Sequence, residues 1–261
     1  MDSYIYPLLS ALQHLPPEVV SIILFATCIL SLLSLLRLFG EQGLYLYNVV
    51  AILASNIQVL KGVQFSMSSE PVALGTILFS TTYLCSDMLT EYYGKDSAKR
   101  GVWFAFFAQL LMTLFMMIAV GYPPLPIEAL GSAGTEHMPL TEQAIAILFT
   151  PSPRLLFASL LAFAISQFID IRIFQALSKL TQQRALWLRT LMSTLISAII
   201  DTLLFSVLAW VILSPNPVTL PVLIFTYVLG TFITRALVSI LSVPIMYISK
   251  RFLPTRVHYV S

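Results

Sequence analysis

Two aspartates stand inside apolar segments of this chain, and the residues around them repeat. The stretch Ser166-Gln-Phe-Ile-Asp170-Ile-Arg-Ile-Phe174 returns as Ser197-Ala-Ile-Ile-Asp201-Thr-Leu-Leu-Phe205. An ionisable side chain at the centre of a membrane helix costs about 2.5–3.5 kcal/mol on insertion scales, so such residues usually mark a functional site. The repeat therefore predicts a site for a substrate, an ion or a proton within a membrane.

The composition is that of a membrane protein. Hydrophobic residues make up 58% of the 261 positions and charged residues 10%, against about 25% charged in soluble domains. This leaves too little polar surface to cover a water-soluble globule. The formal net charge of +2 gives no argument for nucleic-acid binding. We therefore expect an all-α, polytopic transmembrane helical bundle.

Seven apolar stretches approach the ~20 residues that cross a bilayer. They cover residues 19–39, 43–60, 71–92, 101–121, 154–178, 188–213 and 220–249. No change of composition suggests a second folded domain. The chain then divides into an N-terminal segment with one additional transmembrane helix (1–42), a six-helix core (43–250) and a basic tail (251–261).

Basic residues alternate between the two sides of the predicted bundle. Membrane proteins carry an excess of Lys and Arg in their cytoplasmic connections. The long connection at 122–153 is acidic and belongs on the opposite side. This predicts a multi-pass protein of the inner (plasma) membrane with its N-terminus outside and its C-terminus cytoplasmic. The basic residues in question are Lys95, Lys99, Arg100, Lys179, Arg184, Arg189, Lys250, Arg251 and Arg256.

Three aspartates are expected at a similar depth. At 1.5 Å per helical residue, Asp87, Asp170 and Asp201 each lie about 12–18 Å from a basic residue of the nearest predicted cytoplasmic connection. The helical repeat places Gln167 on the same face as Asp170. It also places an aromatic ring, Phe174 or Phe205, one turn beyond each aspartate of the repeat. All six side chains are candidate substrate ligands.

Two further polar residues fall within predicted spans. Arg235 is about 22 Å from Lys250 by helical rise, too far to reach the inner interface, so it needs a carboxylate or a ligand anion nearby. Asn56 can donate and accept hydrogen bonds at once, which suits the edge of a heterocycle. An alternative for Asn56 is a simple bond to a neighbouring helix.

Asp87 and Glu91 are four residues apart, so they stack on one face of a helix. Two like charges in this arrangement repel unless a cation lies between them. We interpret Asp87 as a substrate ligand and Glu91 as a gating or proton-coupling residue. The alternative for Glu91 is an interfacial ion pair with Lys95, Lys99 or Arg100.

Several classes of activity are disfavoured. Gly94-Lys95 lacks the preceding glycine and following Ser or Thr of a phosphate-binding loop, so the chain is not expected to hydrolyse ATP. The histidines, His14, His137 and His258, all fall outside the apolar spans, so no metal site and no cofactor is predicted. An intramembrane aspartic protease would use two carboxyls, but its Gly-rich surroundings are missing. We therefore predict that the chain is not an enzyme.

Taken together, these motifs resemble the queuosine precursor transporter family, also described as vitamin uptake transporters. The combination is more specific than any one motif alone. One departure is Arg235, where the family usually has a lysine. The motifs that carry the resemblance are Ala54-Ser55-Asn56, Ser86 to Lys95, Ser166 to Asp170 with Phe174, Ile200-Asp201-Thr202, and Tyr227 through Arg235 to Tyr247.

The resemblance implies import of a 7-deazapurine, either cyano- or aminomethyl-deazaguanine or queuine, for tRNA modification. It also implies a six-helix core like that of the substrate-binding components of energy-coupling-factor vitamin transporters. A carboxylate would take the guanine-like edge and an aromatic ring would stack on the base. The implied substrate ligands are Asn56, Asp87, Gln167, Asp170, Phe174, Asp201, Phe205 and Arg235.

Three readings remain open from the sequence. The first is a stand-alone secondary transporter in which Asp87, Glu91, Asp170 or Asp201 also carries a proton. The second is a binding component that requires a separate energising ATPase module. The third is a structural protein whose polar residues only join helices, although Ser, Thr and Asn serve that purpose more commonly than charges.

Overall fold

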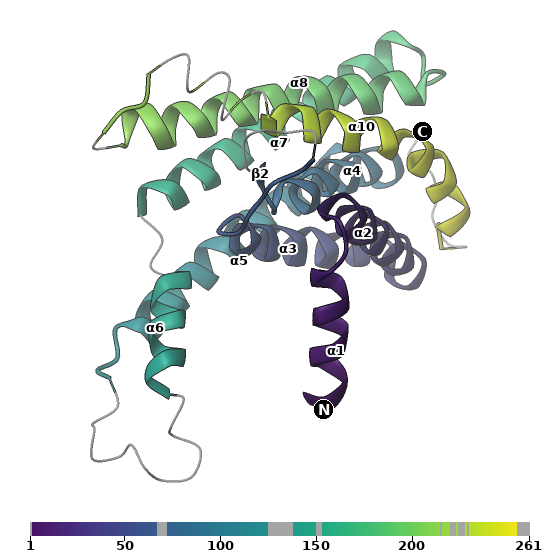
Figure 1. Ribbon diagram of the computed structural model, residues 1–261. Coiled ribbons are helices and arrows are strands. Elements are labelled where there is room, and N and C mark those ends of the chain that lie inside the picture. The colour runs from purple at the N-terminus through teal and green to yellow at the C-terminus, as the bar shows by residue number, and fades with distance from the viewer. Residues whose placement is uncertain are drawn as a thin grey trace.

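The computed structural model describes residues 2–66, 72–124, 138–149, 153–214, 216–219, 223, 228 and 230–254. Much of the predicted acidic connection, part of the last predicted span and most of the tail lie outside these residues. The elements (Figure 1) are α1 Asp2–Gln13, α2 Pro17–Phe39, α3 Glu41–Gln58, β1 Gly62–Val63, β2 Val72–Ala73, α4 Thr76–Tyr93, α5 Lys95–Val120, α6 Met138–Phe149, α7 Pro153–Leu180, α8 Leu186–Val207, the π-helical turn η2 Leu208–Ile212, α10 Gly230–Ser249 and the 3₁₀ turn η4 Lys250–Phe252.

The prediction of an all-α polytopic bundle is confirmed. Within the described residues, seven long helices correspond to the seven predicted spans: α2, α3, α4, α5, α7, α8 and α10. In the described part of the chain, five segments are long and apolar enough to cross a membrane by length and composition. The other two long helices, α3 and α4, carry more polar side chains.

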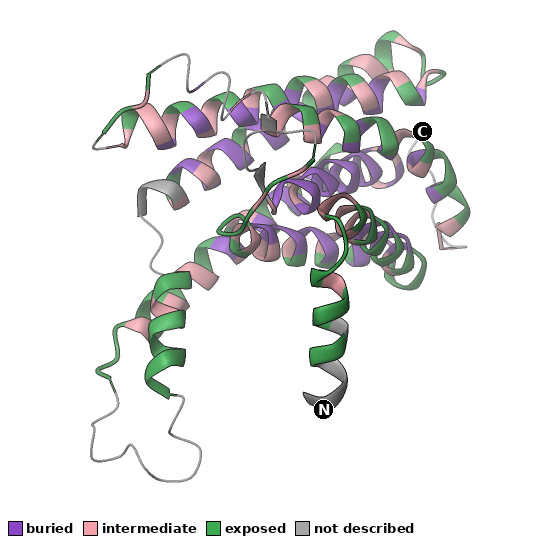
Figure 2. Ribbon diagram, in the orientation of Figure 1, coloured by how far each residue is buried: buried purple, intermediate pink, exposed green. Residues whose placement is uncertain are grey.

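Helix α4 lies at the centre of the bundle. It packs against α2, α3, α5, α7, α8 and α10, and nearly all of its residues are buried (Figure 2). Its hydroxyl side chains donate to carbonyls of their own helix, for example Ser80 to Thr76 at 2.8 Å and Thr90 to Ser86 at 2.8 Å. These bonds let a polar helix occupy an apolar interior because they satisfy the hydroxyl groups locally.

Helices α7 and α8 form an antiparallel pair along the top of Figure 1. A short turn joins them, in which Gln182 and Gln183 adopt positive φ angles of 49° and 63°. The midpoint between Ser166 and Asp201 falls in this turn, as does the midpoint between Asp170 and Ser197. The hairpin therefore brings the two copies of the sequence repeat to the same level of the bundle.

The outer faces of the bundle are apolar. Along α5, the exposed residues include Trp103, Phe104, Phe107, Leu111 and Phe115. Exposed Leu and Ile side chains also occur along α2, α8 and α10. In a bilayer, such surfaces contact lipid chains, so apolar exposure here is consistent with the predicted spans.

Two short helices and one short strand pair of the described residues were not predicted from the sequence. These are α1, α6 and the two-residue antiparallel pair of β1 with β2. Helices α1 and α6 each have 12 residues, fewer than a bilayer requires, so a search for long apolar spans passes over them. The part of each helix that has a burial class is mainly exposed (Figure 2).

Gly43 fixes the close approach of α3 to α2. A Cβ atom at this position would overlap the carbonyl oxygen of Leu35, a backbone atom that cannot swing away. We expect Gly43→Ala to lower the stability of the full-length protein by roughly 1–3 kcal/mol. The measurement is the thermal unfolding midpoint in detergent. Gly121→Ala is the control, since its Cβ would lie 3.3 Å from the nearest atom; equal effects of the two substitutions would contradict the packing argument.

Candidate substrate and ion site

A buried ion pair joins α8 to α10. Arg235 Nη1 lies 2.5 Å from Asp201 Oδ2, and the two residues are 8% and 3% exposed. Removing two charges from water is costly, and the attraction between them offsets that cost only in good geometry. The pair meets the expectation that Arg235 requires a carboxylate within the bundle.

Further contacts extend this pair to α4 and α7. The Arg235 guanidinium lies 4.9 Å from the centre of the Phe79 ring, within range of a cation–π interaction. Ser166 Oγ donates to Asp201 Oδ1 at 3.0 Å, and the Tyr83 hydroxyl donates to Ser166 Oγ at 2.9 Å. We call these five residues the Asp201–Arg235 network, and it links four helices.

The sequence repeat has a geometric meaning in the antiparallel hairpin. Each copy carries a serine four residues before its aspartate, so reversing one helix against the other places each serine opposite the other aspartate. Ser166 accordingly bonds Asp201, and Ser197 borders the Asp170 carboxyl. The repeat thus gives two Ser–Asp pairs across α7 and α8.

Asp170 forms a second acidic centre with Asp87 of α4. Both residues are 0% exposed, and their carboxyl groups lie close enough to interact directly. The hydroxyl groups around them come from α8: Thr194 beside Asp87, with Ser193 and Ser197 beside Asp170. We call Asp87 and Asp170 the carboxyl pair.

The carboxyl pair has no positive partner among the described residues. No Lys or Arg nitrogen of that set forms an ion pair within 4.0 Å of Asp87 or Asp170. Among the described residues, no group donates a hydrogen bond of ordinary geometry to either carboxyl. Arg172, two residues from Asp170, is exposed, so it does not neutralise the pair. Asp201, by contrast, has an ion-pair partner in Arg235 and accepts a hydrogen bond from Ser166.

Gln167 lies one turn from Asp170 on α7. Its Nε2 donates to Thr82 Oγ1 at 2.9 Å, whereas its buried Oε1 has no donor in the part of the chain that the structure describes. Phe174 is fully buried, and Phe205 is half-buried. The structure thus places Gln167 and Phe174 along the same helix as Asp170, as expected.

Asn56 occupies a different part of the bundle. Its Nδ2 donates to Ile52 O at 2.9 Å and to Gln109 Oε1 at 3.2 Å, and its Oδ1 accepts from Ser159 Oγ at 3.1 Å. These bonds tie α3 to α5 and α7, which corresponds to the alternative interpretation of this residue. Both amide hydrogens are used in these bonds. Nothing here tests whether Asn56 also binds substrate, so that role stays a prediction.

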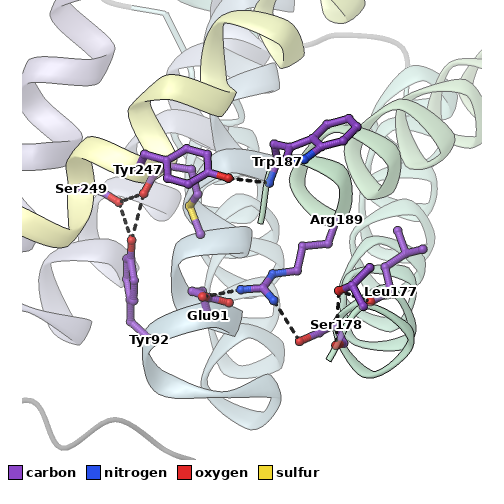
Figure 3. Close-up of polar contacts among 10 residues, drawn as sticks. Glu91, Tyr92, Leu177, Ser178, Trp187, Arg189, Tyr247 and Ser249 are labelled. Atoms are coloured by element: carbon purple, nitrogen blue, oxygen red, sulfur yellow. Dashed lines mark hydrogen bonds and ion pairs between the residues drawn. The ribbon is translucent and has the colours of Figure 1, made fainter. Parts of the chain in front are cut away.

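Glu91 pairs with Arg189 of α8 (Figure 3), at 2.5 Å between Oε1 and Nη2. Arg189 is 2% exposed, donates to Ser178 Oγ at 3.3 Å and lies 5.4 Å from the centre of the Phe174 ring. The sequence had offered Lys95, Lys99 and Arg100 as partners of Glu91.

None of those three residues forms the observed pair. Gly94 ends α4 with a φ of 86°, and the chain then turns into α5, so the following basic residues leave the face that carries Glu91. Lys99 pairs instead with Asp96 at 3.5 Å and Arg100 with Glu41 at 3.4 Å. The partner of Glu91 comes from a helix that is distant in sequence.

The same end of the bundle is held by neutral contacts from α10 (Figure 3). The Tyr92 hydroxyl lies 2.7 Å from Ser249 Oγ and 3.1 Å from Met246 O. The Trp187 backbone N–H donates to the Tyr247 hydroxyl at 3.3 Å. Helices α4, α8 and α10 therefore meet closely around Arg189.

One face of α4 contributes to all three centres. Phe79, Tyr83, Asp87 and Glu91 follow one another at intervals of four residues, so they form a single stripe along the helix. Phe79 and Tyr83 contact the Asp201–Arg235 network, Asp87 forms the carboxyl pair, and Glu91 binds Arg189. Phe79 and Tyr83 were not among the predicted site residues, although extending the spacing of Asp87 and Glu91 by two turns identifies both. Ser166 and Arg189 belong to these centres as well, which their sequence motifs alone do not indicate.

Residues 73–249 match a protein-family model described as "Putative vitamin uptake transporter". The chain belongs to the vitamin uptake transporter family. A relative from Bacillus subtilis (strain 168), named "Probable queuosine precursor transporter", is 30% identical over 218 residues, which cover 83% of this chain and 87% of that protein. No solved structure matches the chain. The three centres all lie within the matched region of this vitamin uptake transporter family member.

These findings confirm the family that the motifs resembled. A member of the vitamin uptake transporter family with several long apolar helices is a multi-pass membrane transporter of a small molecule. The matched region runs from β2 to the end of α10, so it includes the whole α4 stripe and the α7–α8 hairpin. Helices α1, α2 and α3 precede it.

Removing one member of the buried ion pair leaves the other uncompensated. We expect Asp201→Leu to lower stability by about 3–5 kcal/mol, and the double variant Asp201→Leu/Arg235→Met to recover most of that loss. Thermal unfolding in detergent measures both effects. Asp96→Asn, which removes an exposed carboxylate of a surface pair, should leave the midpoint unchanged. A double variant no more stable than the single one would contradict this account of the pair.

Proposed function

We propose that this transporter imports 7-deazapurine precursors of queuosine, either cyano- or aminomethyl-deazaguanine or queuine, for tRNA modification. The observation that carries the proposal is the fully buried Asp170 carboxyl, which has no hydrogen-bond donor among the described residues. The name of the Bacillus subtilis relative supports the same substrate class. We also infer that the protein transports without a separate ATPase module.

The unpaired polar atoms complement a guanine-like edge. Such an edge presents one ring N–H, one NH₂ group and one carbonyl oxygen. The Asp170 carboxylate can accept the ring N–H and one amine hydrogen in a charge-assisted, bidentate manner. Gln167 Oε1, one turn away, can accept the remaining hydrogen, and the unpaired hydroxyl of Ser197 can donate to the carbonyl.

Aromatic rings near the carboxyls provide stacking surfaces for the base. Phe174 lies one turn beyond Asp170 on α7, and Phe205 lies one turn beyond Asp201 on α8. The Phe79 ring already contacts Arg235. We therefore assign base stacking to Phe174 or Phe205, and we assign to Arg235 the role of holding the Asp201 carboxylate in position through their ion pair.

The Glu91–Arg189 pair is proposed as the closure toward the cytoplasm. It lies at the end of the bundle that also carries Lys179 and Lys250, which the distribution of positive charge places inside the cell. With this orientation the N-terminus lies outside. Substrate would leave toward the cytoplasm once this pair separates, because the pair and its neighbours on α4, α8 and α10 occupy that exit.

The substrate proposal is tested by uptake in cells that cannot make deazaguanine precursors. Cells expressing the chain are fed each precursor at low concentration, and queuosine in tRNA is assayed. We expect modification to be restored with no partner ATPase supplied. Asp170→Asn should abolish rescue because an amide cannot replace a bidentate acceptor of two N–H groups.

Asp96→Asn is the matched control, as it changes an exposed aspartate to asparagine. Full rescue by an inserted Asp170→Asn protein would remove Asp170 from the substrate site. Absence of rescue by the correctly inserted wild-type chain would instead reject the substrate class or the stand-alone mechanism.

The closure proposal predicts a different kinetic effect. Glu91→Gln and Arg189→Gln should each reduce steady-state accumulation of substrate more than the initial rate of uptake, because an exit that closes poorly lets substrate leak back. Exchanging the charges, with Glu91→Arg and Arg189→Glu together, should restore part of the accumulation. Glu41→Gln, which breaks the exposed pair with Arg100, is the control. Equal losses of rate and accumulation would exclude a closure role.

A further inference from the structure

The described interior between α4, α7, α8 and α10 contains more carboxyls than cations. Two guanidiniums face it, and each is already bound: Arg189 to Glu91 and Arg235 to Asp201. The acidic groups facing this interior are Asp87, Glu91, Asp170 and Asp201. Two carboxyls, those of Asp87 and Asp170, are therefore left without a positive partner.

Among the side chains that the structure describes, no other helix packed against α4 supplies a compensating charge. Helix α7 contributes Asp170 itself, since Arg172 and Lys179 are exposed. The charged residues of α2, α3 and α5 all lie within a few residues of a helix end, and four of them form the Glu41–Arg100 and Asp96–Lys99 pairs. These residues are Glu18, Arg37, Glu41, Lys95, Asp96, Lys99 and Arg100.

The side chains around the carboxyl pair are polar, and one of them is unpaired. Ser197 Oγ, which borders Asp170, is 0% exposed and lacks a hydrogen-bond partner among the described residues. Ser193 also borders Asp170, and Thr194 borders Asp87. Buried polar atoms normally find partners. The unpaired Ser197 hydroxyl beside two carboxyls without hydrogen-bond donors therefore leaves polar groups available to bind a proton or a ligand.

Two adjacent carboxylates cannot both remain ionised in an interior from which water is excluded. Their repulsion is strong at low dielectric, and neither gains the attraction that would offset its lost hydration. A single proton shared by the pair removes one negative charge. It also turns one carboxyl into a donor that can bond the other, as in other carboxyl pairs.

We propose that Asp87 and Asp170 together bind one proton and that the movement of this proton drives substrate transport. The pair takes up the proton from the outer side, and Asp87 retains it while ionised Asp170 accepts the substrate. After the substrate leaves toward the cytoplasm, water reaches the pair from that side, both carboxylates ionise as the proton follows the substrate, and the hydrated pair returns unloaded. The inference rests on the chain being a transporter, and the proton-binding step is independent of which substrate it carries.

Infrared difference spectroscopy tests proton binding without any substrate. The full-length protein in lipid is taken through a pH jump, and the carbonyl stretch of protonated carboxylic acids is recorded. We expect a band in the wild type that is lost in both Asp87→Asn and Asp170→Asn and kept in Asp96→Asn. These substitutions preserve volume and remove repulsion, so folding should be retained and is checked by thermal unfolding. A band unchanged by both substitutions would overturn the assignment.

Transport in proteoliposomes tests coupling. Radiolabelled cyano-deazaguanine is the probe, and uptake is compared with and without an inward proton gradient. One proton carried with one neutral cyano-deazaguanine moves one positive charge per cycle, so the membrane voltage is held at zero with K⁺ and valinomycin. Each pH unit then supports about tenfold accumulation. We expect this accumulation in the wild type and in Asp96→Asn, and none in Asp87→Asn.

The outcomes separate the two proposals. Failure of the wild type to take up the probe, with the carboxylic acid band present, rejects the substrate while supporting the proton site. Uptake that follows an imposed Na⁺ gradient and ignores the proton gradient, with the band absent, would overturn proton binding and make the pair a sodium site. Gradient-driven accumulation by Asp87→Asn equal to that of the wild type would also overturn the proposal.

Discussion

The cost of holding charge in an apolar interior governs the organisation of this transporter. Asp201 and Arg235 meet that cost through direct contact, with Ser166, Tyr83 and Phe79 completing their surroundings. Because these groups come from α4, α7, α8 and α10, the ion pair also fixes how the four helices meet. If one charge were lost, the other would remain buried and unpaired, which is far more destabilising than the loss of a surface pair.

The stripe of Phe79, Tyr83, Asp87 and Glu91 on α4 contacts three groups of charged residues at successive levels of the bundle. From one end of the helix to the other, it meets a neutralised ion pair, an unneutralised carboxyl pair and a second ion pair with Arg189. The two ion pairs satisfy their charges within the protein. The carboxyl pair does not, so it is the level at which a proton or a substrate gains most by binding. In the proposed mechanism, the occupied and empty states of this pair differ in charge.

The α7–α8 hairpin explains why the aspartates occur as a repeat. When two helices that each carry a serine one turn before an aspartate pack antiparallel, the serine of each helix lies opposite the aspartate of the other. Only one of the two resulting Ser–Asp contacts is a well-formed hydrogen bond, that of Ser166 with Asp201, whereas Ser197 remains unpaired beside Asp170. The two similar sequences thus give one aspartate with its charge paired, Asp201, and one without a partner for its charge, Asp170. The difference arises from the neighbouring helices: Arg235 lies against Asp201, and Asp87 lies against Asp170.

The all-α membrane class, the long helices of the described residues and the family could all be predicted from the sequence, because apolar run length and motif spacing are local properties of the chain. The role of the three aspartates in transport stays a prediction. The sequence also indicated that Arg235 needs a partner. Only the tertiary structure decided which charges meet: Arg235 with Asp201, Glu91 with Arg189 rather than with Lys95, Lys99 or Arg100, and Asp87 with Asp170. These choices depend on which helix faces pack together. Contacts such as that between Glu91 and Arg189 join residues far apart in sequence, and no local periodicity specifies them.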